Sequence, residues 1–192
     1  MLRPLPGVFE NKNDRDIFFN QIKELINIGL NNIEIPWQES ENWLDLMASL
    51  RSEFPYVNLG SASNINQKSI NDSLSLNLNF SMMRFWDKNL FSYSKSKDHL
   101  LIPGISTLKD FQEAVKFDCN FIKIYPVNEK ENSLKIKSYN RKITFIAAGG
   151  LSISDVEKYK LLGYKAIVIG QKGFNGNIFD KRIYNWADIN IT

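Results

Sequence analysis

The stretch ITFIAAGGLSISDVEKYKLLGYKAIVIG, residues 143–170, contains one complete unit of the predicted fold. It begins with an apolar strand at residues 143–147 and passes through a glycine pair into a helix, for which Ser152 or Ser154 offers a cap. Gly163 ends this helix, and a second apolar strand follows at residues 166–169. A strand, a helix and a strand of these lengths indicate parallel pairing through a right-handed crossover.

The same alternation extends through most of the chain. Apolar residues at helical spacing, with Gly29 and Thr107 as stop and cap signals, predict further helices over residues 14–28, 39–53, 66–75 and from Leu108 onward. Short apolar runs predict further strands at residues 31–36, 56–61, 77–82, 100–104 and 121–125, and one more within residues 2–9.

Eight strands that alternate with helices, at roughly 20 to 25 residues for each strand–helix pair, favour a closed barrel over an open sheet. No G-x-G-x-x-G motif follows an early strand, which disfavours a dinucleotide-binding fold. The sequence therefore predicts the α/β class, with residues 1–192 forming one (β/α)8 TIM barrel that is short and trimmed at its termini.

Composition excludes several function classes. The net charge is +3 and the charges are scattered, whereas a nucleic-acid surface needs a basic stripe or patch. No apolar run reaches a bilayer-spanning length, and the N-terminus does not resemble a signal peptide, so we expect a cytoplasmic protein with no membrane partner. His99 has no companion at metal-ligand spacing, and Cys119 is expected to be a small buried side chain, so we expect no metal and no cofactor.

Two charged residues interrupt apolar strands. Glu34 and Lys123 each stand between two isoleucines, and alternation along a strand directs both charged side chains into the barrel. Burial generally lowers the pKa of a lysine and raises that of a carboxyl, which suits a nucleophilic amine and a proton carrier acting on a 2-oxo acid. The pattern alone is equally compatible with a structural Lys–Glu pair that fills the barrel.

Two glycine-containing loops follow the last two strands. Gly149-Gly150 comes after the seventh strand, and Gly170 with Lys172 comes after the eighth. Loops at these positions are the usual phosphate site of this architecture, because glycines let main-chain N–H groups approach an anion. Each pair taken alone is as often a plain turn.

The motifs at these places resemble those of the class I aldolases that cleave 2-keto-3-deoxy-6-phosphogluconate and 4-hydroxy-2-oxoglutarate. The similarity runs in a consistent order from about residue 14 to residue 174, and it is most specific in the fifth and sixth strands. The sixth-strand segment Phe121-Ile122-Lys123-Ile124-Tyr125-Pro126 is similar to the family's K-x-F-P strand. The other matching segments are Ile33-Glu34-Ile35-Pro36, Leu59-Gly60-Ser61-Ala62-Ser63, Ile102-Pro103-Gly104-Ile105-Ser106-Thr107 and Ala148-Gly149-Gly150-Leu151-Ser152.

The resemblance implies a mechanism. Lys123 would form a Schiff base with C2 of the substrate, and Glu34 would act as the general acid/base in the cleavage to pyruvate and an aldehyde. Ser63, Pro103 and the glycine loops would bind the substrate, a small 2-oxo acid or sugar phosphate. The family is typically homotrimeric, so a homotrimer is expected here.

The chain departs from the family pattern around the substrate carboxylate. Gln38 stands where the family has an arginine, and glutamine cannot reproduce the charged two-pronged contact of a guanidinium. We hypothesise that Arg84, at the end of the fourth strand, supplies the missing cation; a solvated surface arginine is the alternative. Ala148 and Lys172 also replace expected hydroxyl residues in the phosphate loops.

Three interpretations remain open at this point. The first is an active class I aldolase. The second is a catalytically degenerate barrel that binds a sugar phosphate or 2-oxo acid without turnover, which Gln38 and the altered loops suggest. The third is another phosphate-binding barrel enzyme, such as an isomerase, in which Lys123 acts only through its charge.

Overall fold

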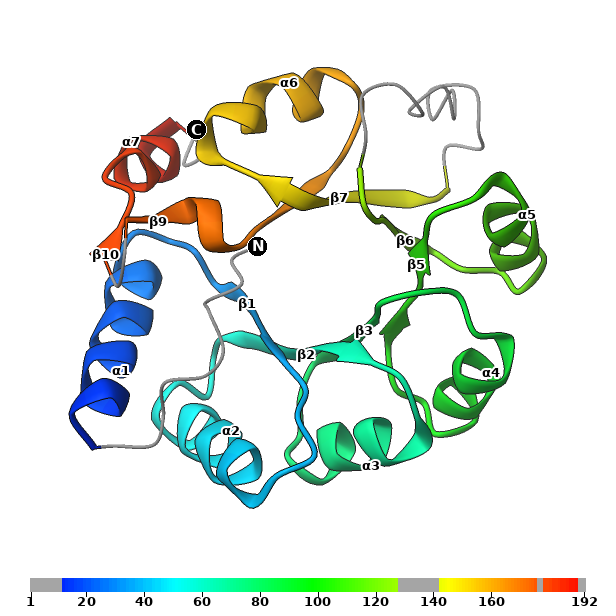
Figure 1. Ribbon diagram of the computed structural model, residues 1–192, viewed down its shortest axis with the longest axis horizontal. Coiled ribbons are helices and arrows are strands. Elements are labelled where there is room, and N and C mark those ends of the chain that lie inside the picture. The colour runs from blue at the N-terminus through cyan, green and yellow to red at the C-terminus, as the bar shows by residue number, and fades with distance from the viewer. Residues whose placement is uncertain (1–11, 128–141, 176–177, 190–192) are drawn as a thin grey trace.

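The computed structural model describes residues 12–127, 142–175 and 178–189, and these form a ring of parallel strands surrounded by helices (Figure 1). The helices are α1 (Lys12–Asn27), α2 (Glu41–Glu53), α3 (Gln67–Ser75), α4 (Lys88–Ser96), α5 (Leu108–Lys116), α6 (Val156–Leu161) and α7 (Arg182–Ile189). The strands are β1 (Asn32–Pro36), β2 (Asn58–Asn64), β3 (Phe80–Met83), β4 (Leu101–Ile102), β5 (Gly104–Ile105), β6 (Phe121–Ile124), β7 (Thr144–Leu151), β8 (Ala166–Ile169), β9 (Phe174–Asn175) and β10 (Ile178–Phe179).

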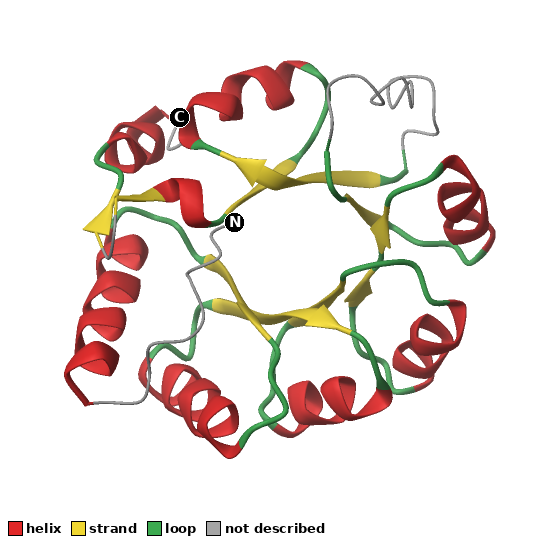
Figure 2. Ribbon diagram, in the orientation of Figure 1, coloured by secondary structure: helices red, strands yellow, loops and turns green. Residues whose placement is uncertain are grey.

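The strands of the ring follow one another in chain order. They form two parallel runs, β1-β2-β3-β4 and β5-β6-β7-β8, with the helices outside (Figure 2). The runs meet at Pro103, whose missing N–H interrupts the ladder while its carbonyl still accepts the main-chain N–H of Lys123 at 2.9 Å. Residues 101–105 thus act as one strand that pairs with β3 at its start and with β6 at its end. The predicted (β/α)8 class is confirmed.

The predicted strands agree with β1 to β8 apart from their boundaries. β2 begins at Asn58 and continues to Asn64, beyond the predicted end at residue 61. β7 continues through Gly149 and Gly150 to Leu151, with a register shift against β8. The strand expected within residues 2–9 lies outside the described residues.

Helix α4 was not predicted from the sequence. Of its nine residues only Leu90 and Ser94 are buried, so the helix has a single buried apolar side chain. Its N-terminus nevertheless has a standard cap, because Asp87 accepts the main-chain N–H groups of Asn89 and Leu90.

A strand pair and one further helix follow β8 in the described residues. A 3₁₀ turn at Gln171–Gly173 leads into the antiparallel pair β9–β10, and α7 has only eight residues. None of the helices in the described ranges has the length and apolar character needed to cross a bilayer.

The apolar residues divide into layers outside and inside the ring. Ile33 and Ile35 belong to an outer cluster with α1 and α2, and Ile122 and Ile124 belong to a second outer cluster that includes residues of α5 and α6. A separate inner cluster contains Phe80, Met82, Ile102, Ile146, Ala148 and Val168. Strand residues therefore alternate between the helix layer and the interior, as the period of two requires.

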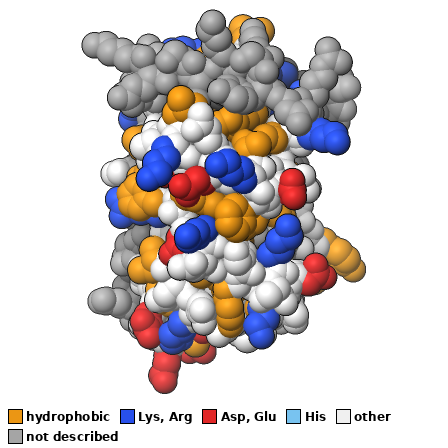
Figure 3. Space-filling model, turned by 90° about the vertical axis from the view of Figure 1, so that its right-hand side faces the viewer, with side chains coloured by type: hydrophobic (Ala, Val, Ile, Leu, Met, Phe, Trp, Pro, Cys, Tyr) orange, Lys and Arg blue, Asp and Glu red, His pale blue; other side chains and the backbone are white. Residues whose placement is uncertain are grey.

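The outer surface mixes side chains of both signs. On the face formed by α4 and α5, Lys and Arg side chains are interspersed with Asp, Glu and apolar side chains (Figure 3). This arrangement agrees with the scattered charges of the sequence.

Candidate active site

Glu34 lies in the middle of β1 and is 1% exposed. Its neighbours Ile33 and Ile35 face the helices, so the carboxyl faces the interior. In register with Glu34 is Gly60 of β2, and a Cβ at Gly60 would lie 2.2 Å from Cε2 of Phe80. The missing side chain at Gly60 thus makes room for the Phe80 ring, which gives the interior beside Glu34 an aromatic wall.

Lys123 lies in β6 and is 5% exposed. Ile122 and Ile124 pack in the outer layer, so the amine faces the interior, next to Ile146, its partner on β7. β1 and β6 stand across the ring from each other, so Glu34 and Lys123 enter the same interior from opposite sides (Figure 1). The interior of an eight-stranded barrel is only wide enough for side chains, which favours their convergence.

Gly104 is the partner of Lys123 on β5, and it allows a close approach of the chain. A Cβ at Gly104 would lie 2.2 Å from the carbonyl oxygen of Arg84. The main chain that leaves β3 therefore passes directly beside the strand neighbouring Lys123. The Arg84 side chain is exposed, and its guanidinium carbon lies 5.2 Å from the ring centroid of Phe85.

Tyr125 directly follows β6 and is the next inward-facing residue after Lys123, and sequence reasoning did not single it out. Its ring is partly buried against the inner cluster, and its centroid lies 5.8 Å from Nζ of Lys123. The available signal was the spacing of two residues from Lys123, which places both side chains on one face of the strand.

The loops after β7 and β8 meet. Gly149 and Gly150 have φ angles of +117° and +65°, a region that glycine enters without a steric penalty. A Cβ at Gly149 would lie 2.9 Å from Cα of Pro126, and a Cβ at Gly150 would lie 3.9 Å from Nζ of Lys172. Gly170 directly precedes the turn that contains Lys172. The predicted anion-binding residues are therefore neighbours in space, although the glycines belong to the bulged end of β7 and not to the first turn of a helix.

A carboxylate of the chain itself lies near Lys172. Asp155 accepts the main-chain N–H of Ser152 at 2.7 Å and its hydroxyl at 2.8 Å. The hydrogen bond from the Ser152 main chain is the largest cause that holds the pKa of Asp155 below its ordinary value, and the charges of Lys172 and Lys158 act in the same direction. The carboxylate of Asp155 thus already balances part of the positive charge of Lys172.

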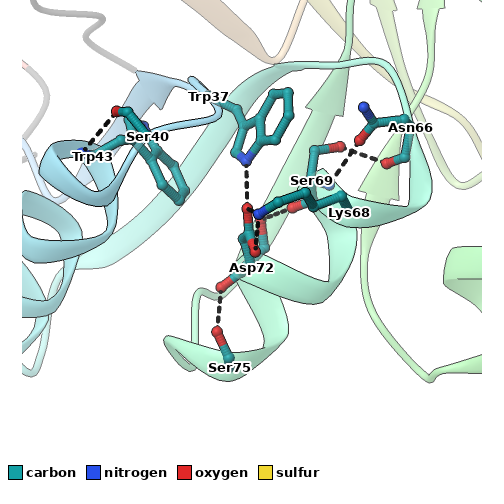
Figure 4. A network of polar contacts seen from close by, with 9 residues as sticks. Trp37, Ser40, Trp43, Asn66, Lys68, Ser69, Asp72 and Ser75 are labelled. Atoms are coloured by element: carbon teal, nitrogen blue, oxygen red, sulfur yellow. Dashed lines mark hydrogen bonds and ion pairs between the residues drawn. The ribbon is translucent and has the colours of Figure 1, made fainter.

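The loop after β1 is anchored to α3. Trp37 is 8% exposed, and its indole N–H donates to Asp72 at 3.0 Å, while Lys68 pairs with the same carboxylate at 3.0 Å (Figure 4). Gln38 follows this anchored residue and is exposed. Trp37 is therefore a core residue, and the position of Gln38 is restrained by the main chain before it.

The carboxyl end of β2 is held by buried hydrogen bonds. Asn64 donates to the carbonyls of Ser61 and Met82, at 3.1 and 3.2 Å. Ser63, which is partly buried, has a φ of +59°, an uncommon value for a residue with a side chain. Ser63 is thus presented at the carboxyl end of β2 by a constrained turn.

Cys119 lies away from these residues, in a surface depression of about 360 Å³ between the C-terminal ends of α4 and α5. The thiol is buried, as predicted, and burial raises its pKa to about 12. Such a thiol is not a nucleophile near neutral pH. Among the described residues, no group of three His, Cys, Asp or Glu side chains is arranged to hold a metal ion.

Known structures share this fold over nearly the whole chain. The 2-keto-3-deoxy-6-phosphogluconate (KDPG) aldolase of Legionella pneumophila, with pyruvate captured as a covalent carbinolamine, is 16% identical with a TM-score of 0.77, covering 97% of this chain and 88% of that one. The Zymomonas mobilis enzyme, with 3-phosphoglycerate, is 18% identical with a TM-score of 0.75 over 97% and 88%. The 3-hexulose-6-phosphate synthase of Salmonella typhimurium is 9% identical with a TM-score of 0.72 over 100% and 99%.

These identities are low, so the structural likeness establishes the fold and not the chemistry. No curated protein sequence matches the chain significantly. The sequence model of the family described as KDPG and KHG aldolase, however, matches residues 3–190, which is nearly the full length. The chain therefore belongs to the KDPG and KHG aldolase family.

Proposed function

We propose that this protein is a class I aldolase that cleaves a substrate resembling 2-keto-3-deoxy-6-phosphogluconate or 4-hydroxy-2-oxoglutarate. The proposal rests on one observation: the only inward-facing lysine of the described strands, Lys123, is buried in an interior that Glu34 enters from the opposite side. The Legionella relative holds pyruvate as a covalent carbinolamine, the adduct of an amine with a ketone, which supports the same chemistry.

The reaction uses the amine of Lys123 as a nucleophile. The amine attacks the C2 carbonyl, and loss of water leaves an iminium that accepts electrons. Glu34 removes the proton of the C4 hydroxyl as the C3–C4 bond breaks, and the aldehyde departs. The bonding electrons enter the iminium to form an enamine, which is protonated at C3 and hydrolysed to pyruvate with release of Lys123.

Borohydride trapping tests the role of Lys123. Pyruvate plus borohydride is expected to add one reduced pyruvate to the wild-type protein, with the modified peptide containing Lys123. Lys123→Met removes the amine and retains an unbranched apolar side chain, so the adduct and the cleavage activity should both disappear. Lys109→Met, at an exposed lysine on α5, is the matched control and should trap pyruvate normally.

A wild-type protein with unchanged mass after reduction would exclude imine chemistry. An adduct at Lys123 without cleavage of either substrate would instead favour the degenerate binding protein. The exposed uncharged Gln38 and the proximity of Asp155 to Lys172 are the observations that favour this second candidate.

We assign the substrate phosphate to the loops after β7 and β8. Gly149, Gly150 and Gly170 expose main-chain groups there, and Lys172 Nζ lies beside Gly150. The Zymomonas relative contains 3-phosphoglycerate, which supports a phosphorylated ligand in this fold.

Replacing Lys172 tests this assignment. Lys172→Gln should raise KM for a phosphorylated substrate by about 10- to 100-fold, because one charge-assisted hydrogen bond is lost. KM for 4-hydroxy-2-oxoglutarate should stay nearly constant. Lys160→Gln, at an exposed lysine of α6, is the control. Equal effects on both substrates would remove Lys172 from the phosphate site.

Arg84 is the proposed partner of the substrate carboxylate, together with Ser63 and Gln38 at neighbouring strand ends. Pro103 would shape the part of the site between these three residues and Lys123. The contact of the Arg84 carbonyl with Gly104 supports this role, because it brings the chain beside the Lys123 strand.

Arg84→Ala should raise the KM for pyruvate in the condensation direction by at least about tenfold, because a charged contact to the carboxylate is lost. Lys88→Ala, at an exposed cation four residues further along, should leave this KM unchanged. If KM is equally unaffected in both variants, Arg84 is a surface residue.

We also propose a homotrimer. Ile65, Phe85 and Leu108 are 64%, 54% and 49% exposed and follow the carboxyl ends of β2, β3 and β5, so they leave apolar surface on one end of the barrel. Light scattering should give a mass three times that of the 22.2 kDa chain, and the mass of a single chain would contradict the proposal.

A further inference from the structure

Strand β6 and the residue directly after it direct two polar side chains inward in succession. Lys123 and Tyr125 are separated by one outward residue, Ile124, so their side chains emerge on the same face roughly 7 Å apart along the strand. Tyr125 lies nearer the carboxyl end, where the loops of this architecture form the active site. Anything bound to the amine of Lys123 therefore has the Tyr125 ring as a neighbour.

The main chain around Tyr125 is held from both sides. Its N–H donates to the carbonyl of Ile105 on β5 at 2.9 Å, and the N–H of Val127 donates to the carbonyl of Ala148 on β7 at 2.7 Å. Gly149 also lets β7 approach Pro126 closely. The main chain that carries the ring is therefore held in place, and the ring centroid lies 5.8 Å from Nζ of Lys123, within the range of a cation–π contact.

The hydroxyl of Tyr125 is available to a ligand. The ring is only partly buried, and within residues 12–127, 142–175 and 178–189 no group forms a hydrogen bond with this hydroxyl. A phenol combines an apolar face with a donor at its tip, and it bonds most strongly to a charged acceptor. The Tyr125 ring thus lies beside the Lys123 amine, and within the described residues its hydroxyl has no hydrogen-bond partner.

We propose that Tyr125 is a substrate-binding residue whose hydroxyl donates a hydrogen bond to the carboxylate of the 2-oxo acid attached to Lys123. The inference rests on the proposed Schiff-base function. In the imine, the carboxylate carbon is bonded to the carbon that the amine attacks, so it lies close to the position where the Tyr125 ring meets Nζ. The phosphate end of a longer substrate extends instead toward Gly150 and Lys172.

The test compares two ketones that differ in the carboxylate. Borohydride reduces the imine that a ketone forms with Lys123, and the amount of this adduct is measured as a function of ketone concentration. Pyruvate and acetone are each titrated in this way with the wild type, Tyr125→Phe and Tyr125→Leu. Tyr125→Phe removes only the hydroxyl and should raise the half-saturating pyruvate concentration about tenfold while leaving that of acetone unchanged. Tyr56→Phe removes a hydroxyl from a side chain that is 97% exposed, and it should change neither value.

The readout is the ratio of the half-saturating concentrations of pyruvate and acetone. Both Tyr125 variants lack the hydroxyl, so either one suffices if the other fails to fold, which thermal unfolding reveals. If the wild type forms the adduct but a folded Tyr125 variant leaves the ratio unchanged, the proposed role of Tyr125 is overturned and the Schiff-base function stands. Equal weakening of both ketones also overturns it, because the hydroxyl then does not act on the carboxylate. No adduct in the wild type refutes the Schiff-base function itself.

Discussion

The two-residue alternation of side chains in a ring of parallel strands is the constraint on which this structure depends. In β1 and β6 it sends the isoleucines into the helix layers and leaves Glu34 and Lys123 inside. Removing an ammonium from water carries an effective cost of several kcal/mol, which only partners or a bound ligand offset. The rest of the fold must therefore accommodate a buried lysine in the barrel.

Glycines create the space that this interior needs. Gly60 leaves room for the Phe80 ring beside Glu34, and Gly104 lets the carbonyl of Arg84 approach the strand next to Lys123. Gly150 similarly lies against the Lys172 amine. At Gly60 and Gly104 the missing Cβ lets a neighbouring group come closer than any side chain would permit, whereas at Gly150 a Cβ would have an ordinary contact distance and the positive φ is what favours glycine. The shape of the candidate site is thus determined as much by absent side chains as by the reactive groups.

Sequence patterns predicted most of the elements, and the exceptions have physical reasons. Helix α4 was not predicted; it has only nine residues, and one of its two buried positions is the polar Ser94. The glycine pair was expected in a loop between the seventh strand and the following helix, but Gly149 and Gly150 lie in the bulged end of β7, which periodicity cannot distinguish from a turn. Tyr125 was overlooked because the distance between its ring and Nζ of Lys123 depends on the side-chain conformations, which the sequence pattern does not give. The single domain and the cytoplasmic location stay predictions.

The sequence by itself determined the alternation of strands and helices, the inward direction of Glu34 and Lys123, and the glycine-containing ends of the last two strands. These features depend on spacing between near neighbours, which the periods of helix and strand fix. Only the tertiary structure decided that Lys172 meets Gly150, that Arg84 passes Gly104, and that Pro103 divides one strand between two partners. Each of these contacts joins residues that are far apart in the chain, and the distance between them in space depends on how the whole ring packs.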